Sequence, residues 1–342
     1  TGSTLGGGRY EIQSLVRLTA FGELFDATDT STGNPVSIQL LDPNLTDESG
    51  QMQALQQWAS KATQVEHRNV ARVIDLATEG EHAYLVSEFW DGLPLEEMLA
   101  SKRMEGTAFS PKQVNNIAAH LCAAVEACAK VGGHGAVTIE SIVVNKAGRV
   151  KLTGLGLGVL APTDSANLGA RLSPETHDGA PPSSQSDVYG VGAVIYELLV
   201  GNAVQAGCKR PSEAVPGLSS LVDQFVGATT NPDKAKRPTV GQLAPAAQKA
   251  LSTPSMEHAA QPAPTPAPQV AKPARPSLAQ SITTPQPGLG GPPLAEPSSP
   301  AARTSAAHSD ALAQALEETR DRWLHSKGKL DYGPFSLASI VD

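Results

Sequence analysis

The sequence predicts an α+β fold, with a strand-rich first part and a helix-rich second part. Up to about Glu88, short runs of β-branched and apolar residues alternate with turn residues such as Thr32-Gly33-Asn34. From Ser110 onward apolar residues recur at helical spacing, and Pro111 suits the first turn of a long helix. Strands followed by helices along one chain are typical of α+β architectures.

The composition argues against several classes of protein. The chain has 342 residues, a net charge of −8 and a pI near 5.5, so we expect no nucleic-acid partner. No apolar run reaches the length of about 18 residues that a membrane helix needs, so we expect no membrane segment in this chain. The three cysteines show no Cys-x-x-Cys spacing, and their odd number fits a reducing compartment. We therefore expect a cytoplasmic protein, or the cytoplasmic part of a longer one.

The order of the predicted elements follows from these patterns. In the first part, the sequence predicts a strand from Arg9, a hairpin over 15–29, a strand over 35–41, a helix over Glu48–Val65, and strands over 71–76 and 82–88. In the second part, it predicts helices over 93–102, 110–130 and 186–201, with a hairpin of strands 142–145 and 149–152 between the last two.

The motifs around that last hairpin resemble those of a protein kinase. A loop with His134 comes first, and a glycine-rich loop at Gly154 and then Ser173-Pro174-Glu175 follow the hairpin. A kinase has His-Arg-Asp-x-x-x-x-Asn, a hairpin, Asp-Phe-Gly and Ala-Pro-Glu in the same order. The resemblance, to bacterial serine/threonine kinases, spans residues 8–251. It implies a two-lobed fold with a small β-rich N-lobe and a larger helical C-lobe.

Most positions that do chemistry in that family hold other residues here. Gln39 stands where the lysine that pairs with the nucleotide phosphates is usual, and Ala136 replaces the catalytic aspartate. Ser141 replaces the asparagine, and Gly154 the aspartate, that hold Mg²⁺. The resemblance therefore implies a pseudokinase in which ATP and Mg²⁺ binding are lost or weak, with no metal site and no other cofactor.

Further substitutions favour the same interpretation. The glutamate that pairs with the lysine falls at Trp58 or Gln57, and neither is acidic. Arg17 and Thr19 replace the first two glycines of the phosphate-covering loop, where side chains would crowd a phosphate. Arg17 could contact a phosphate directly, but we expect a solvated surface arginine.

A nucleotide pocket, if one remains, would use residues that match the family's adenine and phosphate contacts. Gly22 is the third glycine of the phosphate-covering loop, and Ser37 lies two residues before the lysine position. The backbone of Glu88 and Trp90 would face an adenine in the segment that links the two lobes.

Four residues are expected to stabilise the fold: His134, Glu175, Asp187 and Arg237. Asp187 is expected as a cap near the start of the 186–201 helix, where a carboxylate is favoured. The resemblance implies that Asp187 also holds the backbone of the His134 loop. It further implies a partly buried ion pair between Arg237 and Glu175, and losing one partner of such a pair costs about 3–5 kcal/mol.

The end of the chain differs in character. Residues 252–307 contain 13 of the 27 prolines and are expected to form a disordered linker, although a proline-recognising partner remains an alternative. Residues 308–342 are expected to hold a helix over 310–322 and a part, from Trp323, that resembles the start of a GYF-like module, a family that binds proline-rich peptides.

The leading functional hypothesis is an inactive kinase-like domain that acts as a protein-interaction or signalling scaffold for a protein partner. Thr163, Ser165 or Ser173 could respond to phosphorylation. The alternatives are a metal-independent nucleotide sensor and, ranked last, an atypical active serine/threonine kinase. An ATP titration separates the first two.

Overall fold

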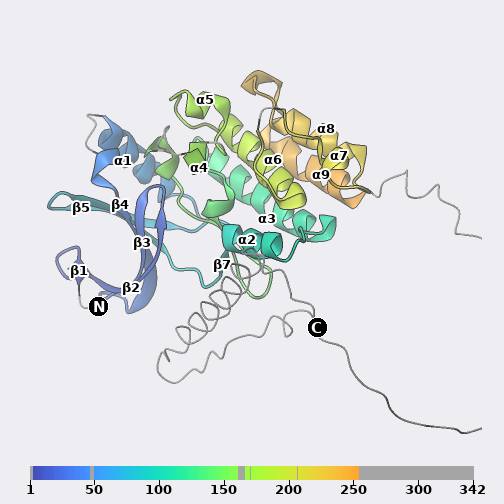
Figure 1. The fold of residues 1–342 in the computed structure, drawn as a ribbon. Coiled ribbons are helices and arrows are strands. Elements are labelled where there is room, and N and C mark those ends of the chain that lie inside the picture. Colours follow the sequence, from blue (N-terminus) through green and yellow to red (C-terminus); the bar gives the residue numbers. More distant parts are fainter. Residues whose placement is uncertain (1–2, 47–49, 161–165, 170, 206, 254–342) are drawn as a thin grey trace, which may run out of the picture. The chain divides into compact units, whose positions relative to one another are not determined.

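The computed structural model describes residues 3–46, 50–160, 166–169, 171–205 and 207–253. Figure 1 shows strands β1–β6 gathered at one end of this part and most of the helices at the other. The linker beyond residue 253, the helix predicted over 310–322 and the GYF-like part lie outside the described residues. So do Thr163 and Ser165.

The small lobe is an antiparallel sheet of six strands in the order β1-β2-β3-β4-β6-β5. Its elements are β1 (Thr4–Leu5), β2 (Tyr10–Thr19), β3 (Gly22–Asp29), β4 (Asn34–Leu41), η1 (Pro43–Leu45), α1 (Gln51–Ala62), β5 (Val73–Glu79) and β6 (His82–Glu88). Strands β2 and β3 form the first predicted hairpin, with Thr19 paired opposite Gly22. Gly22 has φ +123°, and a Cβ there would lie 2.2 Å from the Leu40 oxygen. Only glycine fits this turn.

A small apolar core covers one face of the sheet. It contains Tyr10, Ala27, Val36, Ile38, Tyr84 and Val86. Val36 and Ile38 lie two residues apart on β4, so both side chains point to the same face. The rings of Tyr10 and Tyr84 meet edge to face with centroids 6.3 Å apart.

The large lobe packs its helices around α6. Its elements are β7 (Leu93–Pro94), α2 (Leu95–Met104), α3 (Pro111–Ala129), η2 (Ile139–Ser141), β8 (Ile142–Val144), β9 (Val150–Leu152), η3 (Leu157–Leu160), α4 (Ala166–Gly169), α5 (Pro174–His177), α6 (Ser184–Val200), α7 (Pro211–Ala214), α8 (Ser220–Thr229), η4 (Lys234–Lys236) and α9 (Val240–Ser252). Every residue of α6 from Ser186 to Leu199 is buried. Gly192 lets α6 approach α8, since a Cβ there would lie 2.0 Å from Thr229 Oγ1.

Short backbone contacts join the two lobes next to the 142–152 hairpin. Leu152 N donates to the Asn69 oxygen, and Ala71 N donates to the Leu152 oxygen, each at 2.8 Å. The buried Asn69 amide also donates to the Val150 oxygen at 2.8 Å. The segment after α1 is therefore fixed against β9.

Several element boundaries differ from the sequence prediction. The described part of the first helix runs over Gln51–Ala62 and not to Val65, because the backbone leaves the helix after Thr63. Residues 93–94 form strand β7, and α2 begins only after Pro94, whose ring suits the start of a helix. The 71–76 strand runs over Val73–Glu79.

The caps of the long helices explain where they start. Ser110 caps α3 through a capping box with Gln113, with Pro111 in the first turn as predicted. The prediction that Asp187 caps the later helix is wrong, because the N-cap of α6 is Ser183, which pairs with Ser186. Asp187 turns its carboxylate to the His134 loop instead.

Two further observations concern the described residues. None of their helices is long and apolar enough to cross a membrane. Cys122 and Cys128 are buried free thiols on α3, and Cys208 is an exposed free thiol.

Candidate functional site

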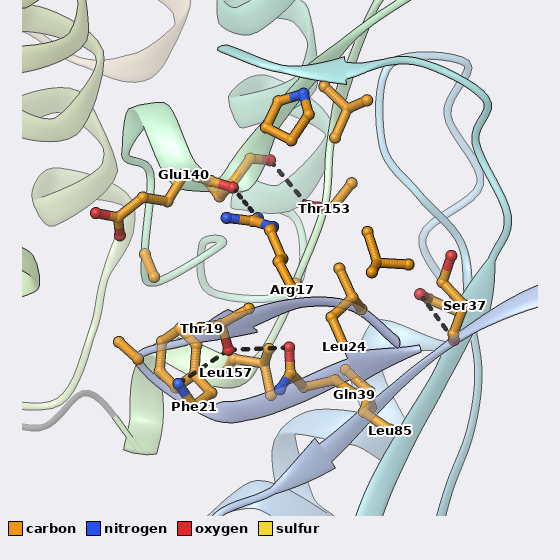
Figure 2. A pocket seen from close by; sticks show the side chains of 18 of the residues that line it. Arg17, Thr19, Phe21, Leu24, Ser37, Gln39, Leu85, Glu140, Thr153 and Leu157 are labelled. Atoms are coloured by element: carbon orange, nitrogen blue, oxygen red, sulfur yellow. Dashed lines mark hydrogen bonds between the residues drawn. The ribbon is translucent and has the colours of Figure 1, made fainter. Parts of the chain in front are cut away.

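A cavity of about 370 Å³ lies between the two lobes. The small lobe contributes β2, the β2–β3 turn, β3, β4 and β6, and the large lobe contributes β7, α2, η2, β8, α4 and the residues after β9. The apolar part of the lining includes Leu24, Leu85, Val143 and Leu157. Figure 2 shows Phe21 and Leu157 at one end, below Arg17. The size is that of a pocket for a small organic molecule.

Arg17 crosses this cavity and is not the solvated surface residue that the sequence suggested. Its Nη2 donates to the backbone carbonyl oxygen of Glu140 at 2.7 Å, and its Nη1 lies 3.7 Å from the carboxylate oxygen Oε2 of Glu96. Its side chain is only 20% exposed. The contact with Glu140 joins residues 123 positions apart, which is why local sequence patterns did not predict it.

Gln39 is buried and bonded to its own lobe. Thr19 Oγ1 lies 3.2 Å from Gln39 Oε1, and Gln39 Nε2 donates to the Leu40 oxygen at 3.2 Å. Thr19 Oγ1 also accepts from Phe21 N at 3.1 Å, as Figure 2 shows. A neutral amide in these bonds brings no positive charge to the cavity.

The large-lobe positions singled out by the sequence line the same cavity. Ala136 is buried and carries no polar side-chain atom. Ser141 Oγ donates to the Thr138 oxygen at 2.9 Å and accepts from Thr138 N at 3.1 Å, which closes a tight turn. Gly154 has φ +77°, and a Cβ there would lie 3.3 Å from Leu157 Cδ1. Leu168 from α4 is buried and completes the lining.

His134 and Asp187 hold the loop next to the cavity. Asp187 accepts from His134 N at 2.5 Å and from Gly135 N at 2.8 Å, the contact that the family resemblance implied. Complete burial raises the pKa of Asp187 to about 7, although the two amide donors oppose this. Burial lowers the pKa of His134 to about 4, so its ring is neutral. Its Nε2 lies 3.0 Å from the Thr153 oxygen, and Ala136 N lies 3.3 Å from its Nδ1.

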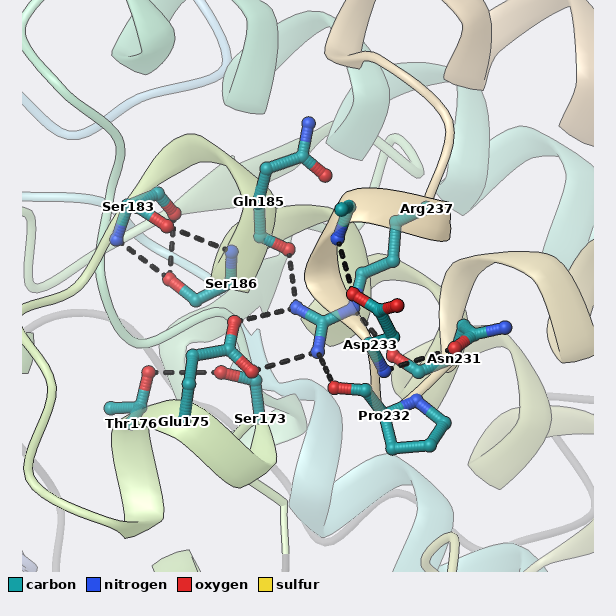
Figure 3. Close-up of polar contacts among 11 residues, drawn as sticks. Ser173, Glu175, Thr176, Ser183, Gln185, Ser186, Asn231, Pro232, Asp233 and Arg237 are labelled. Carbon is teal, nitrogen blue, oxygen red and sulfur yellow. Dashed lines mark hydrogen bonds and ion pairs between the residues drawn. The ribbon is translucent and has the colours of Figure 1, made fainter.

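The ion pair between Arg237 and Glu175 is present and bidentate (Figure 3). Arg237 Nη1 and Nη2 lie 2.6 and 2.7 Å from the two Glu175 carboxylate oxygens. Arg237 also donates to the oxygens of Asn231 at 2.7 Å, Gln185 at 2.9 Å and Pro232 at 3.3 Å. Its side chain is 0% exposed. It therefore ties the start of α5 to the N-terminus of α6 and to the segment after α8.

Comparison with known proteins assigns this architecture to a family. The family model for the protein kinase domain matches residues 18–253. The chain belongs to the protein kinase family.

Bacterial serine/threonine kinases are among the relatives of this chain. The chain is 28% identical over 207 residues to the probable serine/threonine-protein kinase PknB of Corynebacterium glutamicum, covering 56% of this chain and 31% of that protein. It is 25% identical over 251 residues to the serine/threonine-protein kinase PknL of Mycobacterium tuberculosis, covering 67% and 62%. The match thus spans less than two thirds of either relative. The crystal structure of the Mycobacterium tuberculosis PknI kinase domain matches with a TM-score of 0.61 at 18% identity, covering 72% of this chain and 97% of that one.

Side-chain contacts fix the segment around Glu88 and Trp90, whose backbone was expected to face an adenine. Glu88 pairs with Lys151, whose Nζ lies 4.4 Å from the centroid of the Trp90 ring. Glu88 N donates to the Arg72 oxygen at 2.8 Å, and Arg72 N donates to Glu88 Oε2 at 3.2 Å. Ser37 lines the cavity opposite Ser87, whose hydroxyl lies 3.5 Å from the Ser37 oxygen. Glu88, Trp90 and Ser37 therefore line the cavity, whereas Gly22, the fourth residue of the predicted nucleotide pocket, is not part of its lining.

Sequence reasoning missed several residues at this kinase site. Glu96 and Asp26 are carboxylates that line the cavity, although neither stands in a motif. Arg171 pairs with Glu140 and with Glu197 of α6, each at 2.9 Å. Opposite charges brought together from distant segments leave no local signal in one sequence. Among the described residues, no group of three or more His, Cys, Asp or Glu side chains is placed to hold a metal ion.

Trp58 and Ser173, two other positions singled out by the sequence, are engaged in packing or in a buried hydrogen bond. Trp58, at the expected glutamate position on α1, packs against Gly132 and Gly156, with its ring 3.5 Å from where a Cβ of Gly132 would be. Ser173 was a candidate phosphorylation site, but it is buried, and its hydroxyl lies 2.9 Å from that of Thr176. Modification of Ser173 would require this part of the fold to open.

Proposed function

We propose that this protein-kinase-family domain does not transfer phosphate and acts as a protein-interaction scaffold. The observation that carries the proposal is the state of four positions around the cavity. Gln39 and Ser141 are neutral and engaged in local hydrogen bonds, Ala136 is buried, and Gly154 has no side chain.

These residues do not fit Mg²⁺-bound triphosphate. Mg²⁺ prefers carboxylate and phosphate oxygens, and the phosphates need a nearby positive charge during transfer. Among the described residues, Arg17 is the cation that lines the cavity, and it already contacts the Glu96 carboxylate and the backbone oxygen of Glu140. A general base contributes roughly 10²–10⁴-fold to a rate, and an alanine at position 136 supplies none of it.

The scaffold residues stand in contrast. Asp187 accepts hydrogen bonds from two backbone amides of the His134 loop, and Arg237 makes a bidentate pair with Glu175 besides its bonds to nearby carbonyls. A domain with its fold intact and its reactive positions neutral is suited to present a surface to a protein partner.

A phosphate-transfer assay tests the first half of the proposal. The chain, with labelled ATP and either Mg²⁺ or Mn²⁺, should incorporate no label and label no generic protein substrate. Label incorporation that disappears in Asp26→Asn or Glu140→Gln would instead support an atypical active kinase, since both residues line the cavity. The names of the bacterial relatives make this alternative worth testing.

Affinity capture tests the second half. The chain should retain a protein partner equally well with and without Mg²⁺ and ATP in the buffer, because the proposal assigns no nucleotide to the interaction. Failure to retain any partner, or release of the partner by ATP, would count against a scaffold role.

A second candidate is a metal-independent nucleotide sensor. The cavity itself favours it, since about 370 Å³ with a partly apolar lining would accept a nucleoside. Titration with ATP, ADP and adenosine without Mg²⁺, followed by thermal unfolding, decides the matter, because a ligand of the native state raises the melting temperature with its concentration. A scaffold should show no shift with any of the three.

A further inference from the structure

The Arg17 side chain links the two lobes through two separate elements of the large lobe. Arg17 lies on β2 of the small lobe, whereas Glu140 belongs to η2 and Glu96 to α2. The guanidinium donates to the Glu140 oxygen at 2.7 Å and lies 3.7 Å from the Glu96 carboxylate. Figure 2 shows the Arg17 side chain extending from its strand toward the Glu140 backbone. A planar guanidinium can serve two acceptors at once in a fixed geometry.

The acceptor side of this contact is fixed to the core of the large lobe. Glu140 Oε1 lies 2.9 Å from Arg171 Nη1, and Arg171 Nη2 lies 2.9 Å from Glu197 Oε1. Glu197 is on the buried helix α6, is 2% exposed, and also pairs with Arg103 of α2 at 3.0 Å. Burial raises the pKa of Glu140, and the charges of Arg171 and Arg17 oppose that rise. The loop that Arg17 contacts is thus held by the Glu140–Arg171 ion pair, and Arg171 is in turn paired with Glu197 of α6.

Arg17 lies away from the connection between the lobes, so its contacts can restrain the angle between them. The chain passes from one lobe to the other directly after β6, and the Lys151–Glu88 pair lies at that connection. In the sheet order, β2 is separated from β6 by β3 and β4. A bond far from a connection restrains opening more than a bond beside it does. Arg17 is therefore well placed to restrain the movement of the small lobe.

We propose that Arg17 is a built-in latch that holds the two lobes closed across the cavity in the absence of any ligand. The guanidinium occupies the space between β2 and the Glu140 loop and supplies the polar bridge that a bound ligand would otherwise make. The latch holds whether or not the domain transfers phosphate, so its test is independent of the proposed function. A ligand with an anionic group must compete with Glu96 and the Glu140 oxygen for Arg17.

Distance measurement between spin labels on the two lobes tests the latch. In the full chain with Cys208→Ser, labels at Glu81→Cys, in the turn between β5 and β6, and Gln248→Cys, on α9, report on the separation, since both sites are exposed. Cys122 and Cys128 are buried and should not react. With Arg17 present, the distance distribution should be narrow. Arg17→Gln should broaden it and move it to longer distances.

Arg9→Gln is the matched control. Arg9 pairs with Asp29 at 2.9 Å within the small lobe, so its loss removes an arginine ion pair without touching the other lobe. The distribution should stay as narrow as in the parent protein. Arg17→Lys keeps the charge but cannot make both contacts, so its distribution should lie between those of the parent and Arg17→Gln.

Glu96→Gln tests the latch from the large lobe and leaves β2 unchanged. It should broaden the distribution by a smaller amount, because the bond to the Glu140 oxygen remains. An unchanged distribution in Arg17→Gln, confirmed as folded by circular dichroism, overturns the proposal. Should Arg17→Gln not fold, an unchanged distribution in both Arg17→Lys and Glu96→Gln overturns it equally.

Discussion

Replacing Glu175 by glutamine should destabilise the large lobe strongly while keeping the shape of the side chain. The variant leaves the Arg237 guanidinium, 0% exposed, with three backbone oxygens and an amide but without a counter-charge. Breaking a buried ion pair from one side typically costs about 3–5 kcal/mol. Glu175 is 16% exposed, so water can reach it. The loss of stability should therefore lie at the lower end of this range, at about 3 kcal/mol.

This cost is large enough to measure in two ways. In urea unfolding, the free energy of unfolding of the variant should be about 3 kcal/mol lower, and its slope against urea concentration should be unchanged. In thermal unfolding, the melting temperature should fall by about 6–12 °C, given about 2–4 °C per kcal/mol for a domain of this size. The matched control is Glu213→Gln, whose partner Arg210 is exposed, and it should cost much less than Glu175→Gln.

The sign of the pH dependence follows from the same pair. Burial raises the pKa of Glu175, but the hydrogen bond and charge of Arg237 outweigh burial, so the pKa lies below its ordinary value. The pair therefore stabilises the fold above the ordinary carboxyl pKa, and the stabilisation is lost as the pH falls through the lowered value. Glu175→Gln should lack this loss. A cost below about 1 kcal/mol for Glu175→Gln would refute the reasoning, because the buried charge would then not depend on its partner.

Two further predictions concern packing and proton binding. Gly192→Ala should destabilise the protein by about 1–3 kcal/mol in urea unfolding, because its Cβ would lie 2.0 Å from Thr229 Oγ1. Gly227→Ala on α8 meets no atom within 4 Å and should stabilise it by up to about 1 kcal/mol, so equal effects of the two would contradict the account. The buried His134, with a pKa of about 4, should lower stability by about 2 kcal/mol between pH 7 and pH 5, because the unfolded chain takes up the proton first. The difference in stability between the parent protein and His134→Gln should show this slope, and a pH-independent difference would contradict it.

Part of the fold follows from short-range patterns in the sequence. Alternating β-branched residues with turn residues between them predicted the β3–β4 hairpin, and Ser110-Pro111 predicted the start of α3. The contacts of Asp187 and Arg237 came from the resemblance to kinases and not from local patterns. Some helix ends differ from the prediction because another residue caps the helix. Ser183, and not Asp187, caps α6.

The cavity was harder to predict because its contacts depend on how the lobes meet. The resemblance placed Gln39, Ala136, Ser141 and Gly154 around it, and the structure places all four in its lining. No local pattern distinguishes Arg17 from an exposed arginine on a strand. Its role comes from Glu140, which is far away in the sequence and is itself held by Arg171.

Calorimetric titration of the folded chain with ATP in the presence of Mg²⁺ tests the central claim most directly. The account predicts no saturable heat up to millimolar nucleotide, because Gln39, Ser141 and Gly154, at the positions that hold the phosphates and Mg²⁺ in kinases, carry no charge. Saturable binding that requires Mg²⁺, with a Kd below about 1 mM, equivalent to about −4 kcal/mol, would contradict it.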